Sequence, residues 1–389
     1  MAQVKSARGP PGPNPPPAGA RGAAAFPRSA ARLPHVRWAR VMPNGTSVFE
    51  TLYTRGSILG RGASGVAFLV RPKKSPQQQF VAKEICVMRT DEKHRREVYA
   101  EGQLLRDLKH MNIVTCVDVI QENDLMYIVM EYATGGDLSG QIKTLRNERR
   151  HLVEKTVMLV FVQICAALNH IHSRRILHRD LKPANIFIVG EGDLSTCTVK
   201  LGDFGIAKMV ECTMGQANST VGTPSYLSPE ICKNTPYGMK ADVWSLGVVL
   251  YELTCLKVPF HAGNLPAMAL KICTSEPSPV PEEYGAPLAE LIKCLLQKDP
   301  VKRPSVGDVI KREYVQSFMP ETLRSGVAGG DGAGATMQAA MPDLQPAQPR
   351  GSSLHTRPAR QADASAARLP SCDLSSKPVA LAWQRPGDA

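Results

Sequence analysis

The sequence predicts an α+β protein with two unlike lobes: a small antiparallel β-sheet with one helix, then a larger, mainly helical lobe. Three observations predict this. Strand-like runs come first along the chain, and long helical runs follow them. Such segregation is typical of an α+β arrangement. Pro and Gly, 31 of each, crowd toward the two ends, which indicates a folded middle between loose tails.

The first lobe begins with strands. Tyr53–Val70 has the pattern of two short strands around a glycine turn, and Phe80–Cys86 that of a third strand. Glu92–His110 alternates charged and apolar residues at helical spacing, which predicts an amphipathic helix. Leu125–Tyr132 is an apolar run of strand length. Together these elements predict the sheet and its single helix.

The second lobe follows with long apolar runs at helical spacing. They cover Val153–Ser173, Val243–Thr254 and Pro287–Leu296. Beyond residue 318 the composition returns to Ala, Gly, Pro, Ser and Arg. We therefore predict a disordered tail over 1–48, a folded domain over 49–318 whose lobes meet near 132 and 133, and a disordered tail over 319–389.

The net charge of +12 does not indicate a nucleic-acid partner. Seven basic residues and no Asp or Glu precede Glu50, so more than half of the excess charge lies in the Pro-rich tail. A nucleic-acid-binding protein would place its charge on a recognisable module, and none is found. The sequence has no heptad pattern, so coiled-coil dimerisation, and with it any oligomer, is not predicted.

The cysteines and the hydropathy pattern predict a cytoplasmic protein. Ten cysteines are scattered without zinc-site spacing, which favours buried thiols in a reducing compartment. No apolar stretch is long enough to suggest a membrane span, and no secretory signal is recognisable. The Arg-rich, acid-poor residues 1–48 leave an organelle transit peptide as an alternative, which the prolines oppose.

A glycine-rich turn lies between the first two predicted strands. It reads Gly60-Arg61-Gly62-Ala63-Ser64-Gly65, and glycines let a backbone approach phosphate oxygens closely. A dinucleotide-binding fold would start a helix at the third glycine. The β-rich run Val66–Val70 follows instead, so a phosphate-covering hairpin is the better interpretation and an ordinary hairpin the alternative.

A lysine in the next strand matches this hairpin. Lys83 lies within an apolar run, and burying an ammonium is costly unless anions pair with it. Phosphates and a carboxylate from the following helix would provide the pairing. Glu101 is the preferred partner because leucines beside it, at 104, 105 and 108, form the apolar stripe. Glu97 lies among arginines and is the alternative.

Four residues near the middle of the chain supply what phosphoryl transfer to a hydroxyl requires. Asp180 is placed to orient the hydroxyl and accept its proton, and Lys182 to neutralise the γ-phosphate. Asn185 and Asp203 offer hard oxygen atoms for Mg²⁺. Asp180, Lys182 and Asn185 share one short loop, which makes a chance arrangement negligible.

Taken together, these residues resemble the eukaryotic protein kinase family. The motifs occur in the family's order: the glycine loop, Val-Ala-Lys at 81–83, His-Arg-Asp at 178–180, Asn185, Asp-Phe-Gly at 203–205 and Ser-Pro-Glu at 228–230. The resemblance covers roughly residues 53–316 and implies the bilobal protein-kinase fold with ATP and Mg²⁺ as cofactors. Lys182 after Asp180, and Thr223 in Gly-Thr-Pro, resemble the serine/threonine class.

Within that family the sequence is most similar to the NIMA-related kinases. The similarity includes Tyr-Ile-Val-Met-Glu-Tyr at 127–132, Ala184 before Asn185, and Tyr-Leu-Ser-Pro-Glu-Ile at 226–231. It implies a gatekeeper at Met130 and hinge backbone contacts to adenine from Glu131 and Ala133. The ATP-binding residues implied are Leu59, Gly60, Arg61, Gly62, Ala63, Ser64, Gly65, Val66, Ala67, Ala82, Lys83, Met130, Glu131 and Ala133. Ser225 departs from the family's usual tyrosine.

The resemblance also implies structural and regulatory residues. Structural roles fall to Arg179, Glu230, Asp242 and Arg303, with Arg303 expected to pair with Glu230. Ser219, Thr220 and Thr223 are candidate phosphorylation sites, and Arg179 is the kind of arginine that binds a loop phosphate. The expected partners are protein substrates with Ser or Thr. Association with cytoskeleton or cilium is an expectation by family analogy, and a catalytically silent scaffold is the alternative function.

Overall fold

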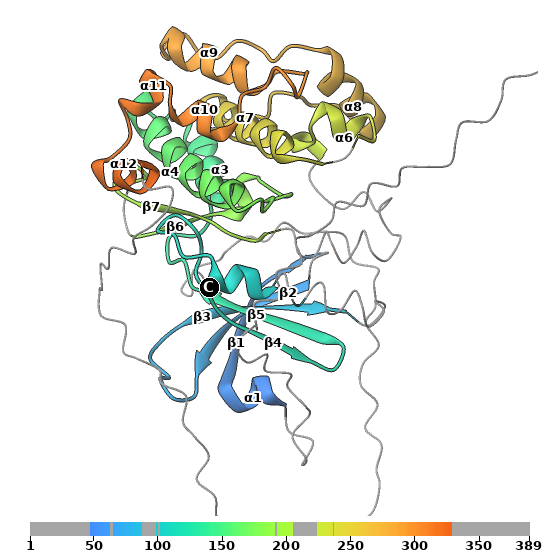
Figure 1. Ribbon diagram of the computed structural model, residues 1–389, viewed down its shortest axis with the longest axis vertical. Helices are drawn as coiled ribbons and strands as arrows, with labels where there is room; N and C mark the ends of the chain where they lie inside the picture. Colours follow the sequence, from blue (N-terminus) through green and yellow to red (C-terminus); the bar gives the residue numbers. More distant parts are fainter. Residues whose placement is uncertain are drawn as a thin grey trace, which may run out of the picture. The chain divides into compact units, whose positions relative to one another are not determined.

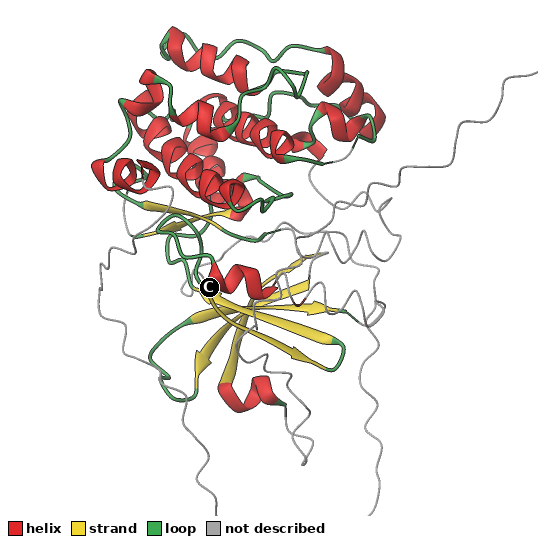
Figure 2. Ribbon diagram, in the orientation of Figure 1, coloured by secondary structure: helices red, strands yellow, loops and turns green. Residues whose placement is uncertain are grey.

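The computed structural model describes residues 47–62, 65–87, 99, 102–190, 193–204, 224–235 and 237–328. All of them belong to one compact unit within residues 39–389. A five-stranded antiparallel sheet is followed along the chain by a mainly helical region (Figure 1). Figure 2 shows most of the helices in that second region, with a second, two-stranded sheet beside them. The predicted α+β class is confirmed.

The first lobe is built on the order β1-β2-β3-β5-β4. Its elements are α1 (Val48–Leu52), β1 (Tyr53–Gly62), β2 (Gly65–Pro72), β3 (Phe80–Cys86), β4 (Cys116–Glu122) and β5 (Leu125–Glu131). The first three strands and β5 lie where the sequence predicted strands. β4 was missed because Asp118 and Gln121 interrupt its apolar pattern. It still forms because it pairs with β5 through the Asn123 turn.

The predicted amphipathic helix is described only at residue 99 and over residues 102–107. There Leu105 is buried, as is Leu108 just beyond it. Leu104 is exposed, so the predicted apolar stripe of three leucines is wrong at this residue. Leu105 and Leu108 are three residues apart and face the core together. Leu104 is adjacent to Leu105 in sequence, and adjacent residues of a helix point in different directions.

A short helix that the sequence did not suggest covers the outer face of the sheet. The Glu122 carboxylate accepts hydrogen bonds from Ser47 Oγ at 2.7 Å and from Val48 N at 3.1 Å. These bonds hold the start of α1, where Phe49 is fully buried and stacks on Tyr127 with ring centroids 4.1 Å apart. The long-range contact with Glu122 explains why so short a segment is helical.

The second lobe contains the remaining elements. They are α3 (Leu138–Glu148), α4 (Glu154–Ser173), η1 (Pro183–Asn185), β6 (Ile186–Val189), β7 (Thr198–Leu201), η2 (Pro224–Tyr226), α6 (Pro229–Cys232), α7 (Met239–Cys255), α8 (Leu265–Thr274), α9 (Ala286–Leu295), α10 (Val306–Ile310), α11 (Glu313–Gln316) and α12 (Glu321–Ala328). α4, α7 and α9 confirm the three predicted helical runs. The ordered chain continues through α12, past the predicted domain end at 318, because Leu323 is buried in the core.

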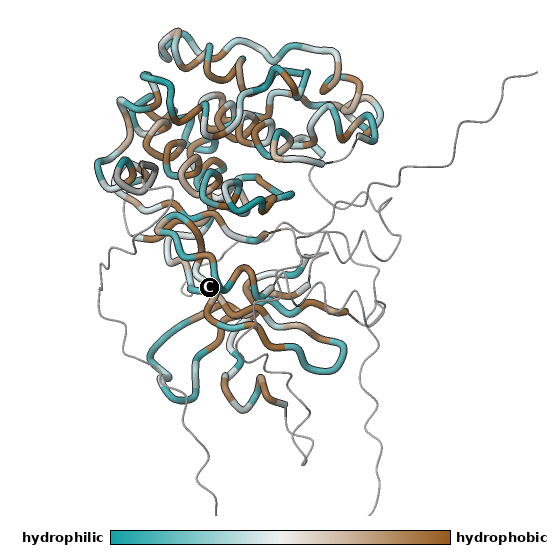
Figure 3. Tube along the Cα trace, viewed as in Figure 1, coloured by the Kyte–Doolittle hydropathy of each residue, from teal (hydrophilic) through white to brown (hydrophobic). Residues whose placement is uncertain are grey.

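The core of this lobe surrounds α4 and α7. Hydrophobic residues concentrate along both helices in Figure 3, and their side chains are mostly buried. With 20 residues and a mean hydropathy of 1.4, α4 is long and apolar enough to cross a membrane. The expectation that no segment would reach that length is therefore wrong. The apolar side chains of α4 pack inside the protein core, which is a sufficient reason for its composition.

Candidate active site

The loop between α4 and β6 brings three predicted catalytic residues together. Lys182 Nζ donates to Asp180 Oδ2 at 2.8 Å. Asn185 Nδ2 donates to the same oxygen at 3.0 Å and to the Asp180 carbonyl at 2.8 Å. The Asp180 carboxylate is therefore fixed by two donors while it stays partly exposed. A fixed, accessible carboxylate is what a base that orients a hydroxyl needs.

A single buried carboxylate holds the backbone of this loop. Asp242, fully buried in α7, accepts hydrogen bonds from His178 N at 2.9 Å and Arg179 N at 3.0 Å. His172 Nε2 and Tyr237 Oη lie 2.8 Å and 2.5 Å from its two oxygens. Burial alone would raise the pKa of Asp242, but these hydrogen bonds and the nearby histidines hold it below its ordinary value. The predicted structural role of Asp242 follows from these four contacts.

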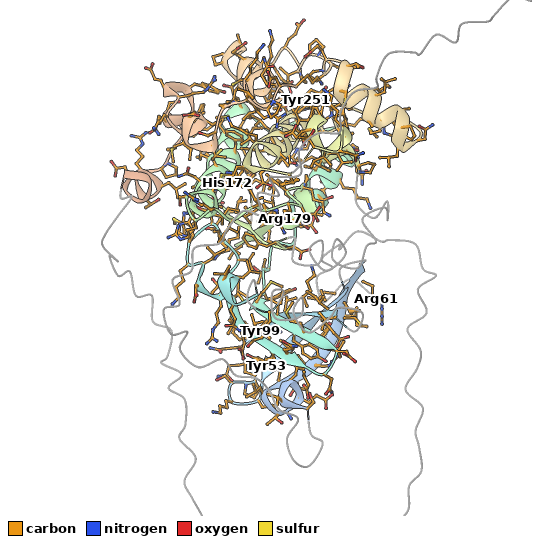
Figure 4. The ribbon with its side chains drawn as sticks, turned by 45° about the vertical axis from the view of Figure 1, so that its right-hand side comes forward. Tyr53, Arg61, Tyr99, His172, Arg179 and Tyr251 are labelled. Carbon is orange, nitrogen blue, oxygen red and sulfur yellow. The ribbon has the colours of Figure 1, made fainter. Side chains whose placement is uncertain are left out.

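The same contacts fix an unusual backbone conformation. Arg179 has φ of 67°, in the left-handed region that non-glycine residues seldom adopt. The bond from its N–H to Asp242 helps to offset that cost. Figure 4 labels Arg179 and His172, which lie in the same part of the second lobe. His178 is fully buried, and burial lowers its pKa, so its ring stays neutral between the Asp180 N–H and the Gly202 carbonyl.

Lys83 and Asp203 meet across the two lobes. Lys83 Nζ donates to Asp203 Oδ1, and both side chains are largely buried. Asp203 lies just after β7, with φ of 53°. The Phe204 ring next to it packs on His178 with centroids 5.1 Å apart. Lys83, which was predicted to pair with anions, is therefore buried next to the Asp203 carboxylate. This pairing offsets the cost of burying its ammonium group.

Asn185 and Asp203 fit a Mg²⁺ ion. The Gly202 N–H donates to the Asn185 carbonyl at 3.0 Å, which places the segments that carry these side chains next to each other. The amide nitrogen of Asn185 is used by Asp180, so its oxygen is the atom left to bind a cation. Among the described residues no cluster of three His, Cys, Asp or Glu side chains offers a competing site. A carboxylate and an amide oxygen are hard ligands of the kind Mg²⁺ prefers.

A pocket of about 430 Å³ opens beside Lys83 and Asp203. Besides those two residues, it is lined by Ala67, Val81, Val114, Met130, Glu131, Ala133 and Phe187. Four predicted ATP-binding residues, Ala67, Met130, Glu131 and Ala133, therefore lie where they were expected, and Lys83 makes a fifth.

Two other predicted ATP-binding residues point to the wrong side of the sheet. Ala82 is fully buried in the cluster around Phe49, and Val66 packs against the same cluster. Side chains alternate along a strand, so Val81 and Lys83 share one face while Ala82 takes the other. The prediction of Ala82 is thus corrected to Val81. Ala67, which pairs with Lys83 in the sheet, is the residue of β2 that lines the pocket.

The glycine loop forms the predicted β-hairpin, with Gly60 opposite Ala67 and Gly62 opposite Gly65. Gly65 has φ of 122°, and a Cβ atom there would lie 1.9 Å from the Glu84 carbonyl oxygen. Only glycine fits this position. Leu59 and Arg61 belong to β1 of the same hairpin, and Arg61 is labelled near its end in Figure 4.

The hinge residue Glu131 is tied to both lobes. Its Oε1 accepts hydrogen bonds from Thr115 N at 2.7 Å and from Lys200 Nζ at 2.8 Å. Its own N–H donates to the Thr115 carbonyl at 3.0 Å. Met130 lines both the first pocket and a second one that reaches Cys116 and Phe204, and Lys83, Val114 and Asp203 also line both.

The predicted pair of Glu230 and Arg303 is present and fully formed. Arg303 Nη1 and Nη2 donate to the two carboxylate oxygens at 2.7 and 3.0 Å, and Arg303 is 0% exposed. Burial by itself would raise the pKa of Glu230, but the hydrogen bonds from Arg303 hold it below the ordinary value. The pair anchors α6, just after η2, against the rest of the second lobe.

Some predicted residues cannot be placed. Glu101, its alternative Glu97, and Ala63, Ser64, Ser219, Thr220 and Thr223 lie outside the described residues. Other functional residues were missed: Val81, Val114, Phe187, His172, Tyr237 and Lys200. Strand alternation could have found Val81 from Lys83. No local signal in the sequence links Lys200 to Glu131 or Tyr237 to Asp242.

Comparisons with known proteins agree with this geometry. Residues 53–315 match the family model described as protein kinase domain. Serine/threonine-protein kinase Nek1 of Mus musculus is 41% identical over 271 residues, which cover 70% of this chain and 22% of the relative. Nek3 of the same species is 41% identical over 70% of this chain and 51% of the relative. For nekl-2 of Caenorhabditis elegans the identity is 38% over 69% of this chain and 75% of the relative.

The coverage differs widely among these relatives. The chain spans between about a quarter and a half of the length of Nek1 and Nek3, and three quarters of nekl-2. In every case the matched part corresponds in length to the folded lobes described above.

Proposed function

The chain belongs to the protein kinase family, among its NIMA-related members, and from this premise we propose that it transfers the γ-phosphate of ATP to serine or threonine hydroxyls of proteins. One observation carries the proposal. Asp180 is held by Lys182 and Asn185 on one side of a site whose other side is the buried pair of Lys83 and Asp203. A catalytically silent scaffold would have no need for this complete set of charged groups.

Different residues around the pocket would contact different parts of ATP. Ala67, Val81, Val114 and Phe187 offer apolar surfaces that would enclose the adenine ring. The N–H of Glu131 is already bonded to Thr115, so this hinge residue would offer adenine its carbonyl oxygen, and Ala133 would contribute the next backbone groups. The glycine hairpin would cover the phosphates, with Lys83 neutralising part of their charge.

Asp180 would then act on the incoming hydroxyl. Its carboxylate orients the hydroxyl and takes up the proton as the oxygen attacks the γ-phosphorus, while Lys182 neutralises charge on the transferred group. Mg²⁺, held by Asn185 and Asp203, supplies positive charge on the phosphates when bound. Because Lys182 is itself bonded to Asp180, its ammonium moves little between the carboxylate and the phosphate.

The hydroxyl preference and the regulation are part of the same proposal. Lys182, in the serine/threonine form of the loop, favours serine and threonine over tyrosine. Phosphorylation of Ser219 or Thr220 would add a dianion that Arg179 can bind, and Thr223 is a third candidate. We propose a cytoplasmic protein that acts on protein substrates and, by family analogy, associates with the cytoskeleton or the cilium.

The test is a transfer assay with γ-labelled ATP and a peptide library that contains Ser, Thr or Tyr acceptors. We expect label on Ser and Thr peptides with the wild type. Asp180→Asn should lose at least about a hundredfold in kcat, within the usual contribution of general-base catalysis. Asp193→Asn, which changes an exposed carboxylate in the turn between β6 and β7, is the matched control and should retain full activity.

Each outcome decides between the two functions. ATP binding by the wild type without transfer to any peptide would favour the scaffold and reject the kinase. Equal activity of Asp180→Asn and wild type would leave a kinase but remove the role given to Asp180. Label on tyrosine alone would contradict the proposed hydroxyl class.

A further inference from the structure

Two amide side chains hold β7, the strand that ends two residues before Asp203. Asn112 lies between the helix at 102–107 and β4, is 1% exposed, and donates from Nδ2 to the Val199 carbonyl at 2.9 Å. The same nitrogen donates to Gln163 Oε1 at 2.9 Å. That oxygen also accepts the Val199 N–H at 2.8 Å. Both backbone polar groups of Val199 are therefore bonded to this amide pair.

These contacts cover the edge of β7 that does not pair with β6. Among the described residues β6 and β7 form a two-stranded sheet, so the other edge of β7 needs partners from elsewhere. Farther along this edge, Leu201 N donates to the Asn112 carbonyl at 2.8 Å, and the Leu201 carbonyl accepts from Val114 N at 2.9 Å. The edge is thus held from Val199 to Leu201, next to the segment that carries Asp203.

Gln163 connects this edge to the core of the second lobe. It belongs to α4, most of whose residues are buried. Its Nε2 donates to the Leu159 carbonyl, one turn earlier in α4, at 3.1 Å, and to the Cys197 carbonyl, just before β7, at 3.4 Å. These bonds fix the amide in one orientation, with Oε1 directed toward Asn112 and Val199.

The conformation of Asp203 depends on the residues before it. Its φ of 53° lies in the left-handed region, and a non-glycine residue keeps such a conformation only where its surroundings hold it. Gly202 gives part of this support, because its N–H donates to the Asn185 carbonyl at 3.0 Å and its carbonyl oxygen lies 3.1 Å from His178 Nε2. The rest comes from β7, whose free edge the two amides hold.

Asn112 carries its amide in spite of an energetic cost. The Oδ1 atom is buried and has no hydrogen-bond partner among the described residues. A buried acceptor without a partner is unfavourable, and an apolar side chain would avoid that cost. The amide is explained by its nitrogen, which bonds both Val199 and Gln163.

We propose that Asn112 and Gln163 are positioning residues for Asp203, which hold β7 so that the Asp203 carboxylate stays in its metal-binding position. The inference rests on the proposed kinase function, in which Asn185 and Asp203 hold Mg²⁺. Neither amide lines either pocket, so both act through the strand. Loosening this edge should weaken the binding of ATP with Mg²⁺ more than the binding of ATP alone.

The first measurement is calorimetric titration of the full chain with ATP, once with Mg²⁺ and once with EDTA. Asn112→Asp keeps the shape of the side chain but removes both donated hydrogen bonds, and Gln163→Met removes the shared acceptor. Groups that orient a metal ligand change metal affinity by about tenfold or more, so the Kd for ATP with Mg²⁺ should rise about tenfold in both variants. The Kd with EDTA should change by less than about twofold.

Gln163→Glu is the conservative variant. Its carboxylate still accepts from Asn112 Nδ2 and Val199 N and loses only the longer bonds that Nε2 donates. Its Kd with Mg²⁺ should therefore stay within about threefold of the wild type. Because Asn112→Asp adds the same charge nearby, this comparison separates the loss of hydrogen bonds from the added charge. Asn147→Asp, at an exposed residue of α3, should match the wild type in both titrations.

Hydrogen exchange of the nucleotide-free chain is a second readout, which needs neither metal nor transfer. The peptide over 198–202 contains the N–H groups of Val199, Leu201 and Gly202, which these contacts protect. It should exchange about tenfold faster in Asn112→Asp and Gln163→Met than in the wild type. Peptides from α9 should exchange at the wild-type rate, because the loosening is local.

Several results would overturn the proposal. One is faster exchange throughout the chain with equal loss of ATP binding with and without Mg²⁺, which would indicate a general structural role. Another is faster exchange at 198–202 with an unchanged Kd in Mg²⁺, because β7 would then not position Asp203. Equal losses in Gln163→Glu and Gln163→Met would also contradict it. A wild type that binds ATP with Mg²⁺ and transfers no phosphate would reject the kinase function alone, since both readouts here are independent of transfer.

Discussion

Glu131 and Lys200 connect the hinge to the strand that leads to Asp203, with 2.8 Å between Oε1 and Nζ. Both side chains are mostly shielded from solvent, at 26% and 14% exposure. β7 is also bonded to the segment before β4, through Leu201 N to Asn112 O at 2.8 Å and Val114 N to Leu201 O at 2.9 Å. These hydrogen bonds therefore connect the hinge, which would contact adenine, to the strand that leads to Asp203, which would bind Mg²⁺.

The substitution Lys200→Met should weaken ATP binding. It removes the ammonium and leaves the Glu131 carboxylate with Thr115 N alone, so the hinge is held less firmly. For a partly exposed pair we expect a loss of about 1 kcal/mol, seen as a roughly fivefold higher KM for ATP with little change in kcat. Lys257→Met, at an exposed lysine, is the control. Unchanged KM values in both variants would show that the pair does not position the hinge.

Tyr237→Phe should lower kcat with little effect on the KM for ATP. The change removes the hydroxyl that donates to Asp242 at 2.5 Å, and Asp242 in turn holds the backbone at His178 and Arg179. A hydrogen bond to a charged group contributes about 1.5 kcal/mol or more, which corresponds to about a tenfold lower kcat. The measurement is steady-state kinetics, which gives kcat and the KM for ATP, together with the melting temperature of the variant. Reduced stability with normal kcat would indicate a purely structural tyrosine.

The buried ion pair of Arg303 and Glu230 should matter far more for stability than a surface pair. Arg303→Met leaves a buried carboxylate without its partner, which should cost about 3–5 kcal/mol of unfolding free energy. The matched control is Arg150→Met, since Arg150 is 72% exposed and pairs with Glu148 at 2.9 Å. The unfolding free energy of Arg150→Met should fall by less than about 1 kcal/mol. Denaturant unfolding of both variants measures the difference, and equal losses would contradict this ranking.

Stability should fall as the pH is lowered from 6.5 toward 4, partly through His110. Burial, with the positive groups of His170, Arg174 and Lys200 nearby, lowers the pKa of His110 from 6.5 to about 4. In this window the unfolded chain binds a proton that the folded chain excludes, so stability is full above 6.5 and decreases below it. The pKa of Glu230 and of Asp242 is lowered from 4.5 and 3.8, so their contributions are lost only at lower pH.

The variant His110→Gln tests this assignment. Its amide oxygen can still accept from Asn112 N, as His110 Nδ1 does at 3.0 Å, but it does not titrate. Its melting temperature should therefore depend less on pH between 6.5 and 5 than that of the wild type. His261→Gln, at an exposed histidine, should keep the wild-type dependence. A slope in His110→Gln equal to the wild type would assign the effect to other histidines, such as His178 and His170.

Local sequence can specify only some parts of the site. Asp180, Lys182 and Asn185 belong to one short loop, and this small sequence separation keeps their side chains close together. Gly65 was predicted as part of the glycine motif, and its φ of 122° and the nearby Glu84 carbonyl explain why only glycine fits there. The prediction of Ala82 was wrong for a local reason as well: side chains alternate along a strand, so the residue next to Lys83 faces the opposite side of the sheet.

The sequence alone determined the chemistry of this protein: which residues carry the carboxylates, the ammonium groups and the glycines, and in what order. Periodicity also determined the strands and long helices, because side-chain direction follows from backbone geometry. Only the tertiary structure decided which distant groups meet. Lys200 reaches Glu131 and Tyr237 reaches Asp242 because packed strands and helices bring them together, and such contacts depend on the whole core rather than on any neighbouring residues.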